Sequence, residues 1–168
     1  TKENYFDIVN YCKERKITFL CTPWDTPSVD FLEELGTSAY KIASGDMTNF
    51  PLIKYISKTG KPMIISTGMS KIEEVKKMVS FVKTLNGQFV LLHANSTYPS
   101  PIESLNVSLI PEYKKKFDVQ IGFSDHETGI IGSLTAANIG AVIIERHITL
   151  DKKMKGLDHS SSLEPNEF

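Results

Sequence analysis

The chain has 168 residues, of which 40% are hydrophobic and 23% charged, and its formal net charge at pH 7 is -1. This composition is ordinary for one globular domain with its own core. The near-neutral charge gives no reason to expect nucleic acid or an anionic membrane as a partner, and no apolar run approaches the roughly 20 residues of a membrane-spanning helix. Cys12 and Cys21 match neither a disulfide framework nor a zinc spacing, so we expect reduced thiols in a cytoplasmic protein.

In chain order, the sequence predicts helices that alternate with short apolar strands. A helix over 3–15 precedes a strand over 17–24, a helix over 26–36, a strand over 39–45, a helix over 48–60, a strand over 62–68, a helix over 70–87, strands over 89–96 and 119–126, a helix over 128–140 and a strand over 141–149. The six strands do not alternate cleanly with polar residues, which is typical of strands covered on both faces in a parallel sheet.

The segment 70–87 has the clearest helical pattern. Ser70 and Glu73 have the spacing of a capping box, and Gly87 is placed to end the helix. Its apolar residues fall on one stripe: Ile72, Val75, Met78, Val79, Val82 and Leu85.

The alternation of helix and strand predicts an α/β fold with a right-handed parallel sheet. A doubly wound sheet usually carries a glycine-rich turn at one switch point, and no G-x-G-x-x-G occurs. A (β/α)8 TIM barrel instead places functional residues at the carboxyl ends of many strands. Polar or chargeable residues end all six predicted strands, which favours the barrel: Thr22, Ser44, Ser66, Ser96, Ser124 with His126, and Glu145 with His147.

The spacing of the repeats indicates a partial barrel. Ser44 lies 22 residues after Thr22 and 22 before Ser66, and eight such units need about 200 residues or more. We therefore expect residues 1–168 to be one catalytic barrel domain that carries strands 3 to 8 and lacks the first two strands and the last helix. Such an arc has two unpaired apolar edges, 17–22 and 141–147, which we expect to seek partners.

Seven segments in order resemble the N-acetylneuraminate (sialic acid) synthase family. They run from about residue 17 to the end of the chain: FLCTPWD, YKIASGDMTNFPLI, GKPMIISTGMS, LLHANSTYPSP, IGFSDHETG, IERHITLDK and GLDHSSSLEP. The family also includes synthases for legionaminic and pseudaminic acids and spore-coat polysaccharide proteins.

The resemblance implies that phosphoenolpyruvate condenses with N-acetylmannosamine or a related N-acetylated aminosugar, giving a nine-carbon 2-keto acid and phosphate for surface polysaccharide biosynthesis. A divalent metal assists, Mn²⁺ with Mg²⁺ or Co²⁺ as alternatives, by polarising the aldehyde that the methylene carbon attacks. The resemblance also implies a homodimer with a small C-terminal antifreeze-like domain. This domain and the first two strands are missing here, so we expect the 168-residue chain by itself to be inactive.

Two other functions remain open at this point. One is a different phosphoenolpyruvate-dependent sugar-acid synthase with another acceptor. The other is a non-catalytic module that binds the ligand without turnover, which would not need Glu145, His126 and His147. The sequence does not distinguish the proposed condensation from metal-dependent aldol chemistry.

The resemblance assigns the metal to His126 and His147, which end neighbouring predicted strands. It places Glu145 against the sugar near the reacting aldehyde; the alternative is a carboxylate that orients His147. Ser124 and His126 share strand parity, as do Glu145 and His147, so each pair can point into the barrel.

Six further positions match those that hold phosphoenolpyruvate in the family: Thr22, Lys41, Ser44, Ser66, Ser96 and Ser124. A ligand with a carboxylate and a phosphate needs a cation and several short donors, which suits this set. Lys41 and Ser44 have opposite parity, so the strand must end or bulge between them. The alternative role for any one serine is to cap the following helix.

Tyr98 and Asp158 match the family's aminosugar contacts, and the alternative for Asp158 is a turn residue. We expect His93 to be structural because its parity opposes that of Ser96. Asp125 and His159 are left without a role.

Overall fold

The computed structural model describes residues 1–85 and 87–168. Its helices are α1 (Lys2–Glu14), α2 (Thr26–Glu34), α3 (Phe50–Ser57), α4 (Ile72–Thr84), α5 (Leu109–Phe117) and α6 (Ile131–Asn138). Its strands are β1 (Tyr40–Ile42), β2 (Met63–Ser66), β3 (Phe89–Ala94), β4 (Gln120–Asp125) and β5 (Ile144–Arg146), and short 3-10 turns cover Ser44–Asp46, Ile102–Ser104 and His159–Ser161. No helix in these ranges is long and apolar enough to cross a membrane.

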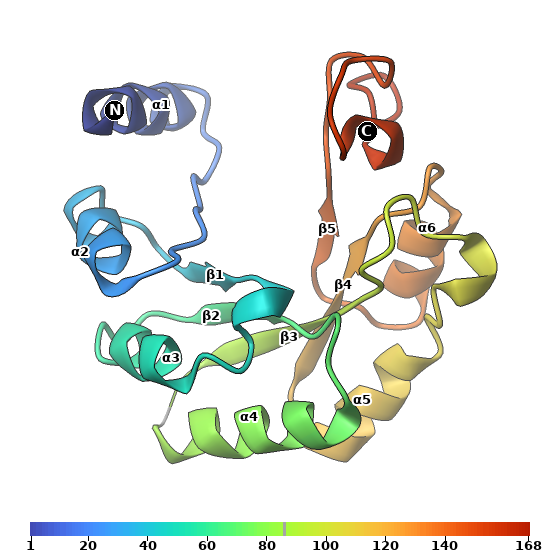
Figure 1. The fold of residues 1–168 in the computed structure, drawn as a ribbon, viewed down its shortest axis with the longest axis horizontal. Coiled ribbons are helices and arrows are strands. Elements are labelled where there is room, and N and C mark those ends of the chain that lie inside the picture. Colours follow the sequence, from blue (N-terminus) through green and yellow to red (C-terminus); the bar gives the residue numbers. More distant parts are fainter. Residues whose placement is uncertain (86) are drawn as a thin grey trace.

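The five strands form one parallel sheet in the order β1-β2-β3-β4-β5. The sheet curls, with α3, α4, α5 and α6 along its outer face and with α1 and the C-terminal segment beyond its two ends (Figure 1). The predicted α/β fold with a parallel sheet is therefore confirmed.

The core lies between the outer face of the sheet and the helices. Alternate strand residues point outward and form rows across the sheet, such as Ile42, Ile65, Leu91 and Ile121, each at most 1% exposed. Burying one such side chain fully contributes about 1.5–3 kcal/mol. The predicted stripe of α4 meets this layer, with Val75, Met78, Val79 and Val82 buried. The intervening strand residues face the concave interior.

The predicted strand over 17–24 is wrong. In the part of the chain that the structure describes, this segment is in no strand, Ile17 is 63% exposed and Trp24 is 64% exposed. An apolar run predicts burial, but a strand also needs ladder hydrogen bonds, and β1 forms its recorded ladder with β2 only. The sheet thus has five strands instead of the expected six. The run 141–149 contains a shorter strand, β5, which is an edge as predicted.

Two helical features also differ from expectation. Helix α5 was not among the predicted helices, because Pro111 and three consecutive lysines obscure its pattern, and only Ile110 and Phe117 are buried in it. The N-cap of α4 is Lys71, one residue after the predicted Ser70, since the Glu74 carboxylate accepts the Lys71 N–H at 2.7 Å in place of the expected Ser70–Glu73 pairing. Position 86 of the predicted helix lies outside the described residues.

Gly122 in β4 is expected to tolerate no side chain. A Cβ there would lie 2.5 Å from Leu92 Cδ2 and 2.6 Å from the Ile143 backbone oxygen. The Gly122→Ala variant should lose about 1–3 kcal/mol of unfolding free energy through this overpacking, measured by urea denaturation. In the matched control, Gly129→Ala, the nearest atom is Glu127 Oε2 at 3.7 Å, so its stability should stay within about 0.5 kcal/mol. Equal stability of the two variants would contradict the packing described here.

Candidate active site

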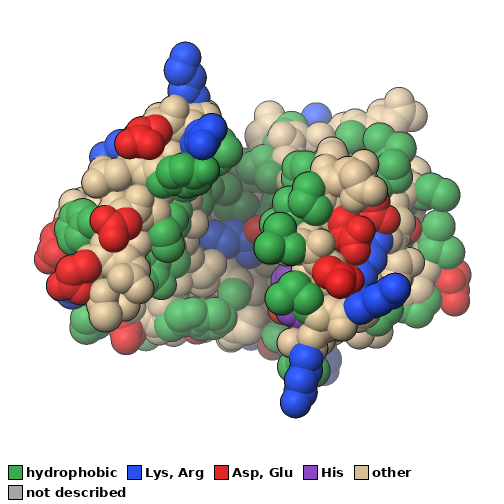
Figure 2. Space-filling model, turned by 90° about the horizontal axis from the view of Figure 1, so that it is seen from above, with side chains coloured by type: hydrophobic (Ala, Val, Ile, Leu, Met, Phe, Trp, Pro, Cys, Tyr) green, Lys and Arg blue, Asp and Glu red, His purple; other side chains and the backbone are tan. Residues whose placement is uncertain are grey.

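A cavity of about 410 Å³ lies at the carboxyl ends of the strands. Seen from above, the molecule has a hollow between two halves, with lysine or arginine and histidine side chains deep inside (Figure 2). Nine of the eleven predicted site residues line this cavity: Lys41, Ser44, Ser66, Ser96, Tyr98, Ser124, His126, Glu145 and His147.

Lys41 crosses the interior from β1. Its Nζ donates to Ser66 Oγ at 2.8 Å and lies 3.5 Å from Glu145 Oε2. Strand β1 ends at Ile42 and a 3-10 turn begins at Ser44, which is the break that lets residues of opposite parity share one cavity. Ser44 Oγ accepts the Gly68 N–H at 3.1 Å, so the loops after β1 and β2 are tied together.

Glu145 is the counter-charge of Lys41. Ser124 Oγ on the neighbouring strand donates to Glu145 Oε1 at 2.7 Å, so the two carboxylate oxygens face different partners. Burial lowers the pKa of Lys41, and the Glu145 carboxylate opposes that effect. A ligand anion placed beside Lys41 would, like Glu145, raise the pKa of the ammonium against the effect of burial.

His126 and His147 face each other with ring centroids 5.2 Å apart. His126 Nδ1 lies 2.6 Å from the Asn95 carbonyl oxygen; because a carbonyl only accepts, Nδ1 carries the proton and Nε2 is free. His147 Nδ1 lies 3.8 Å from Asp158 Oδ2. Metal-binding histidines usually have a carbonyl or carboxylate behind the other ring nitrogen.

The two imidazoles fit a divalent ion. Burial lowers the pKa of His126, which favours the neutral ring that a metal requires. In the described part of the chain no group of three or more His, Cys, Asp or Glu is placed to hold a metal.

Tyr98 forms a wall beside the histidines. Its ring centroid lies 4.1 Å from that of His126 and 5.7 Å from that of His147. Burial raises the pKa of Tyr98, and Asp158 and Glu145 raise it further, so the phenol keeps its proton and can donate a hydrogen bond.

Two predicted site residues lie apart from the cavity lining. Thr22 lines a separate cavity with Thr1, Tyr5 and Phe31. Asp158 is in the loop before the last 3-10 turn; it lies behind His147, and its charge also acts on Tyr98.

The other two histidines lie outside the cavity lining. His93 packs on the opposite face of β3, as its parity predicted, with Nε2 2.8 Å from the Leu105 carbonyl oxygen and its ring stacked on Phe123. His159 Nδ1 lies 2.7 Å from Thr149 Oγ1.

Four residues that line the cavity were missed from the sequence: Trp24, Ala43, Gly45 and Met69. Gly68, which lies directly against Ser44 and Ser96, was missed as well. Gly68 has the clearest reason to be there, because a Cβ would lie 2.8 Å from Ser44 Oγ and would also crowd Ser96 Oγ. A glycine two residues after the end of a buried strand was a signal for such a close approach. Met69 adopts φ 58, which its sequence gave no reason to expect.

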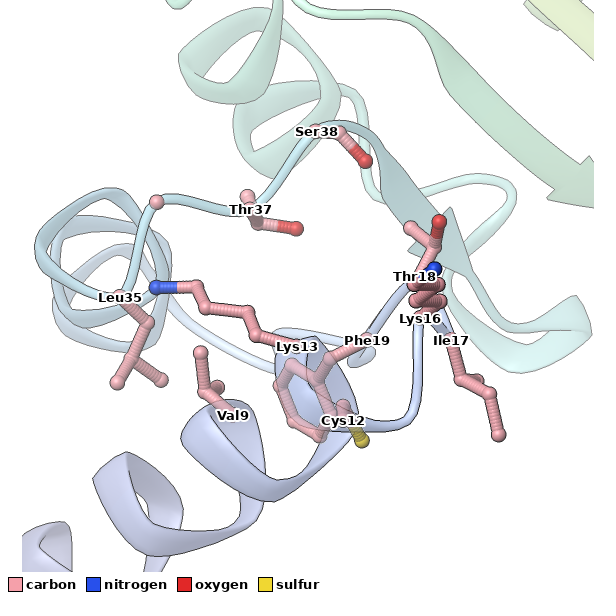
Figure 3. A pocket seen from close by; sticks show the side chains of 11 residues that line it. Val9, Cys12, Lys13, Lys16, Ile17, Thr18, Phe19, Leu35, Thr37 and Ser38 are labelled. Atoms are coloured by element: carbon pink, nitrogen blue, oxygen red, sulfur yellow. The ribbon is translucent and has the colours of Figure 1, made fainter.

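Another cavity, of about 350 Å³, lies between α1 and the loop that follows α2. Figure 3 shows Lys13 extending from α1 across it, toward Leu35 and Thr37. Ser38, which also lines it, comes just before β1. The cavity is thus at the amino end of that strand, the face that contributes to stability and not to chemistry in barrels.

Comparison with known proteins agrees with the architecture. A family profile described as the NeuB family matches residues 1–168. The human N-acetylneuraminate-9-phosphate synthase is 45% identical over 167 residues, which are 99% of this chain and 46% of the human protein. The N,N'-diacetyllegionaminic acid synthase of Campylobacter jejuni is 42% identical over 166 residues, 96% of this chain and 49% of that protein. The chain spans about half the length of these curated relatives.

Among solved structures, the N-acetylneuraminic acid (sialic acid) synthetase of Leptospira borgpetersenii, crystallised with citrate, superposes with a TM-score of 0.95 at 36% identity. The match covers 99% of this chain and 59% of that one. The five parallel strands therefore form a curled half-barrel of the (β/α)8 class, which confirms the predicted fold class and its partial extent.

Replacing Glu145 is expected to change the ionisation of Lys41. In Glu145→Gln the carboxylate that opposes burial is gone, so the pKa of Lys41 should fall further below its ordinary value. An NMR titration of ¹³C-dimethylated lysines would measure the shift. Glu33→Gln is the control, because Glu33 Oε1 pairs with Lys61 at 2.7 Å and not with Lys41. A Lys41 titration that is the same in both variants would show that the two side chains do not interact.

Proposed function

The chain belongs to the NeuB family, and we propose that the protein carrying it condenses phosphoenolpyruvate with N-acetylmannosamine or a related N-acetylated aminosugar. The products are a sialic-acid-type nonulosonic acid for surface polysaccharides and inorganic phosphate. The observation that carries this proposal is the convergence of one cation, several serine hydroxyls, a carboxylate and two imidazoles in a single cavity.

The phosphoenolpyruvate half of the cavity is built from β1, β2 and the loops that follow β1 and β3. Lys41 supplies the cation, and Ser44, Ser66 and Ser96 supply short donors on the same wall. A trianionic ligand matches this donor set. Its binding would also offset the desolvation of the Lys41 ammonium, which Glu145 compensates only in part.

The acceptor half is built from β4, β5 and Tyr98. A divalent ion, Mn²⁺ with Mg²⁺ or Co²⁺ as alternatives, would be held by His126 and His147 and would supply Lewis-acid polarisation of the acceptor aldehyde. Ser124 fixes Glu145 through one oxygen, which leaves the carboxylate oriented to accept a hydrogen bond from an acceptor hydroxyl. Tyr98 would donate to the sugar, and Asp158 would contact it from the loop behind His147.

The reaction requires that phosphoenolpyruvate and the acceptor sugar lie side by side in the two halves of the cavity. The double-bond electrons of phosphoenolpyruvate form the new bond from its methylene carbon to the aldehyde carbon, while the carbonyl π electrons move to the aldehyde oxygen, which takes up a proton to become a hydroxyl. Water adds at the adjacent cationic carbon and loses a proton, and the C–O bond to phosphate then breaks, which releases inorganic phosphate and leaves the 2-keto group. Holding both reactants in one cavity contributes an effective concentration that free solution does not provide. Lys41, beside the phosphate, would stabilise the charge on the leaving group.

Two alternative functions remain. A related synthase would use a different acceptor sugar, and a binding module would hold phosphoenolpyruvate without turnover. The similarity to an N,N'-diacetyllegionaminic acid synthase supports a different aminosugar as the acceptor. A module that only binds phosphoenolpyruvate would have no use for the Glu145, His126 and His147 group. We further propose a cytoplasmic homodimer: both cysteines are free thiols, and the homodimer follows from the family resemblance.

The activity is tested by phosphate release. The full-length protein carrying this segment, supplied with Mn²⁺ and phosphoenolpyruvate, should release phosphate only when an N-acetylated aminosugar with a free aldehyde is added. N-Acetylmannosamine and diacetylated aminosugars would be compared. The 168-residue chain, assayed in parallel, should show at least a hundredfold lower turnover, because misplacement of reacting groups by about 1 Å costs on the order of a hundredfold. Phosphate release that does not depend on any sugar would refute the condensation.

The metal assignment is tested at the two histidines. In the full-length protein, His126→Ala and His147→Ala should each weaken Mn²⁺ binding and lower turnover by at least a hundredfold, since one imidazole then remains. Isothermal titration of the chelated protein measures binding, and circular dichroism checks the fold. His159→Ala is the matched control, because His159 bonds Thr149 outside the cavity. Full activity of either site variant after Mn²⁺ repletion would disprove the assignment.

A further inference from the structure

We propose that Asp125 and Arg146 are positioning residues whose buried ion pair fixes the geometry of the two histidines and Glu145. This inference rests on the proposed function for the role of the histidines. The ion pair with its hydrogen bonds to Glu127 and Ser133, called the clamp below, is a property of the chain itself. Arg146 Nη1 donates to Asp125 Oδ2 at 2.6 Å, and the two side chains are 3% and 0% exposed.

The ion pair lies at the carboxyl end of the β4–β5 ladder. Asp125 is opposite Arg146 in the β4–β5 register, and both strands end at these residues. The preceding pair, Ser124 with Glu145, and the following pair, His126 with His147, both face the cavity. Within the described residues the β4–β5 ladder ends at Asp125 and Arg146, so their ion pair is a cross-strand restraint directly beside the two histidines.

The Arg146 guanidinium group donates hydrogen bonds to the residues on both sides of His126. Nη1 binds the Asp125 carboxylate, and Nη2 donates to the Glu127 carbonyl oxygen at 2.7 Å. The Glu127 N–H in turn donates to Asp125 Oδ1 at 3.0 Å. The backbone of His126 is thus held between two anchored neighbours, which directs its ring toward the Asn95 carbonyl and the cavity.

Helix α6 anchors the clamp from outside. Ser133 Oγ donates to Asp125 Oδ2 at 2.6 Å and also accepts from Arg146 Nη1 at 3.2 Å. The Gly132 N–H donates to the buried Glu127 carboxylate. Since Gly132 and Ser133 lie in the first turn of α6, the ends of β4 and β5 and the start of α6 form one connected polar unit.

Stability alone does not explain this network. Burying a charged pair costs several kcal/mol per ion in desolvation, and apolar residues of similar volume are often as good or better. Arg146 Nε is buried without a hydrogen-bond partner in the described structure, which adds to the cost. The planar guanidinium group can donate to the Asp125 carboxylate and the Glu127 carbonyl oxygen at the same time, which an apolar side chain cannot do.

The experiment compares Arg146→Lys with a destabilised control in the full-length protein. Lysine keeps the charge but cannot reach the Asp125 carboxylate and the Glu127 carbonyl together. Outer-shell changes of this kind weaken metal binding by about 10–100-fold. We expect that loss in Mn²⁺ titrations of Arg146→Lys, and, in the metal-free protein, a shifted or broadened ¹⁵N signal of the His126 ring. Ile53→Ala, a buried position in α3, should lower the melting temperature without either change.

Asp125→Asn, which keeps the shape and removes the charge, is the second variant and should show the same two changes if Arg146→Lys does not fold. Mn²⁺ affinity and His126 signals that stay at the unmodified values would overturn the proposal, as would an Ile53→Ala protein that reproduces both changes. If the unmodified protein binds none of Mn²⁺, Mg²⁺ and Co²⁺, the metal assignment of the proposed function fails, and the His126 ring signals alone then decide whether the Asp125–Arg146 pair positions that ring.

Discussion

The site depends on the curl of the sheet, and the Lys41–Glu145 ion pair shows how far that curl goes. These residues belong to β1 and β5, the first and last strands of the sheet, yet Nζ and Oε2 are 3.5 Å apart. In a flat sheet, strands separated by four steps of about 4.8 Å would not bring these groups together. The twist that makes parallel sheets close therefore also brings the cation of one edge to the carboxylate of the other.

The second constraint is the register of β4 against β5. Since strand side chains alternate, a slip of one residue would turn Glu145 outward and bring a neighbouring residue into the cavity. The pairing of Ser124 with Glu145 is held by a ladder and by their own hydrogen bond, so backbone and side chain specify the same register. Lys41 then meets a carboxylate already fixed in place, which lowers the entropic cost of ordering its long side chain.

Strand parity made much of the site predictable, because it is a local property. Shared parity paired Ser124 with His126 and Glu145 with His147 on the interior side, and the break between Lys41 and Ser44 follows from their opposite parity. The segment 17–24 could not be placed, since an apolar run shows a tendency to be buried while a strand is defined by its neighbour's hydrogen bonds. For the same reason Thr22 was grouped with the site although it lines another cavity. Arg146 was overlooked because its partners, Asp125 and the Glu127 carbonyl, lie about twenty residues away.

The tripeptides Ser-Asp-His (124–126) and Glu-Arg-His (145–147) now have a common physical explanation. In each, the outer two residues face the cavity and the middle one faces the helix layer, and the middle residues carry opposite charges that meet. A segment that looks like a continuous run of catalytic groups is thus divided between the cavity and the scaffold at every second residue. Placing a buried charge pair directly beside the reactive groups costs stability, but it restrains the strand ends at the point where the ladder stops. The geometry of the cavity side chains is in this way set from the outer face of the sheet, where Asp125 and Arg146 contact Ser133 of α6.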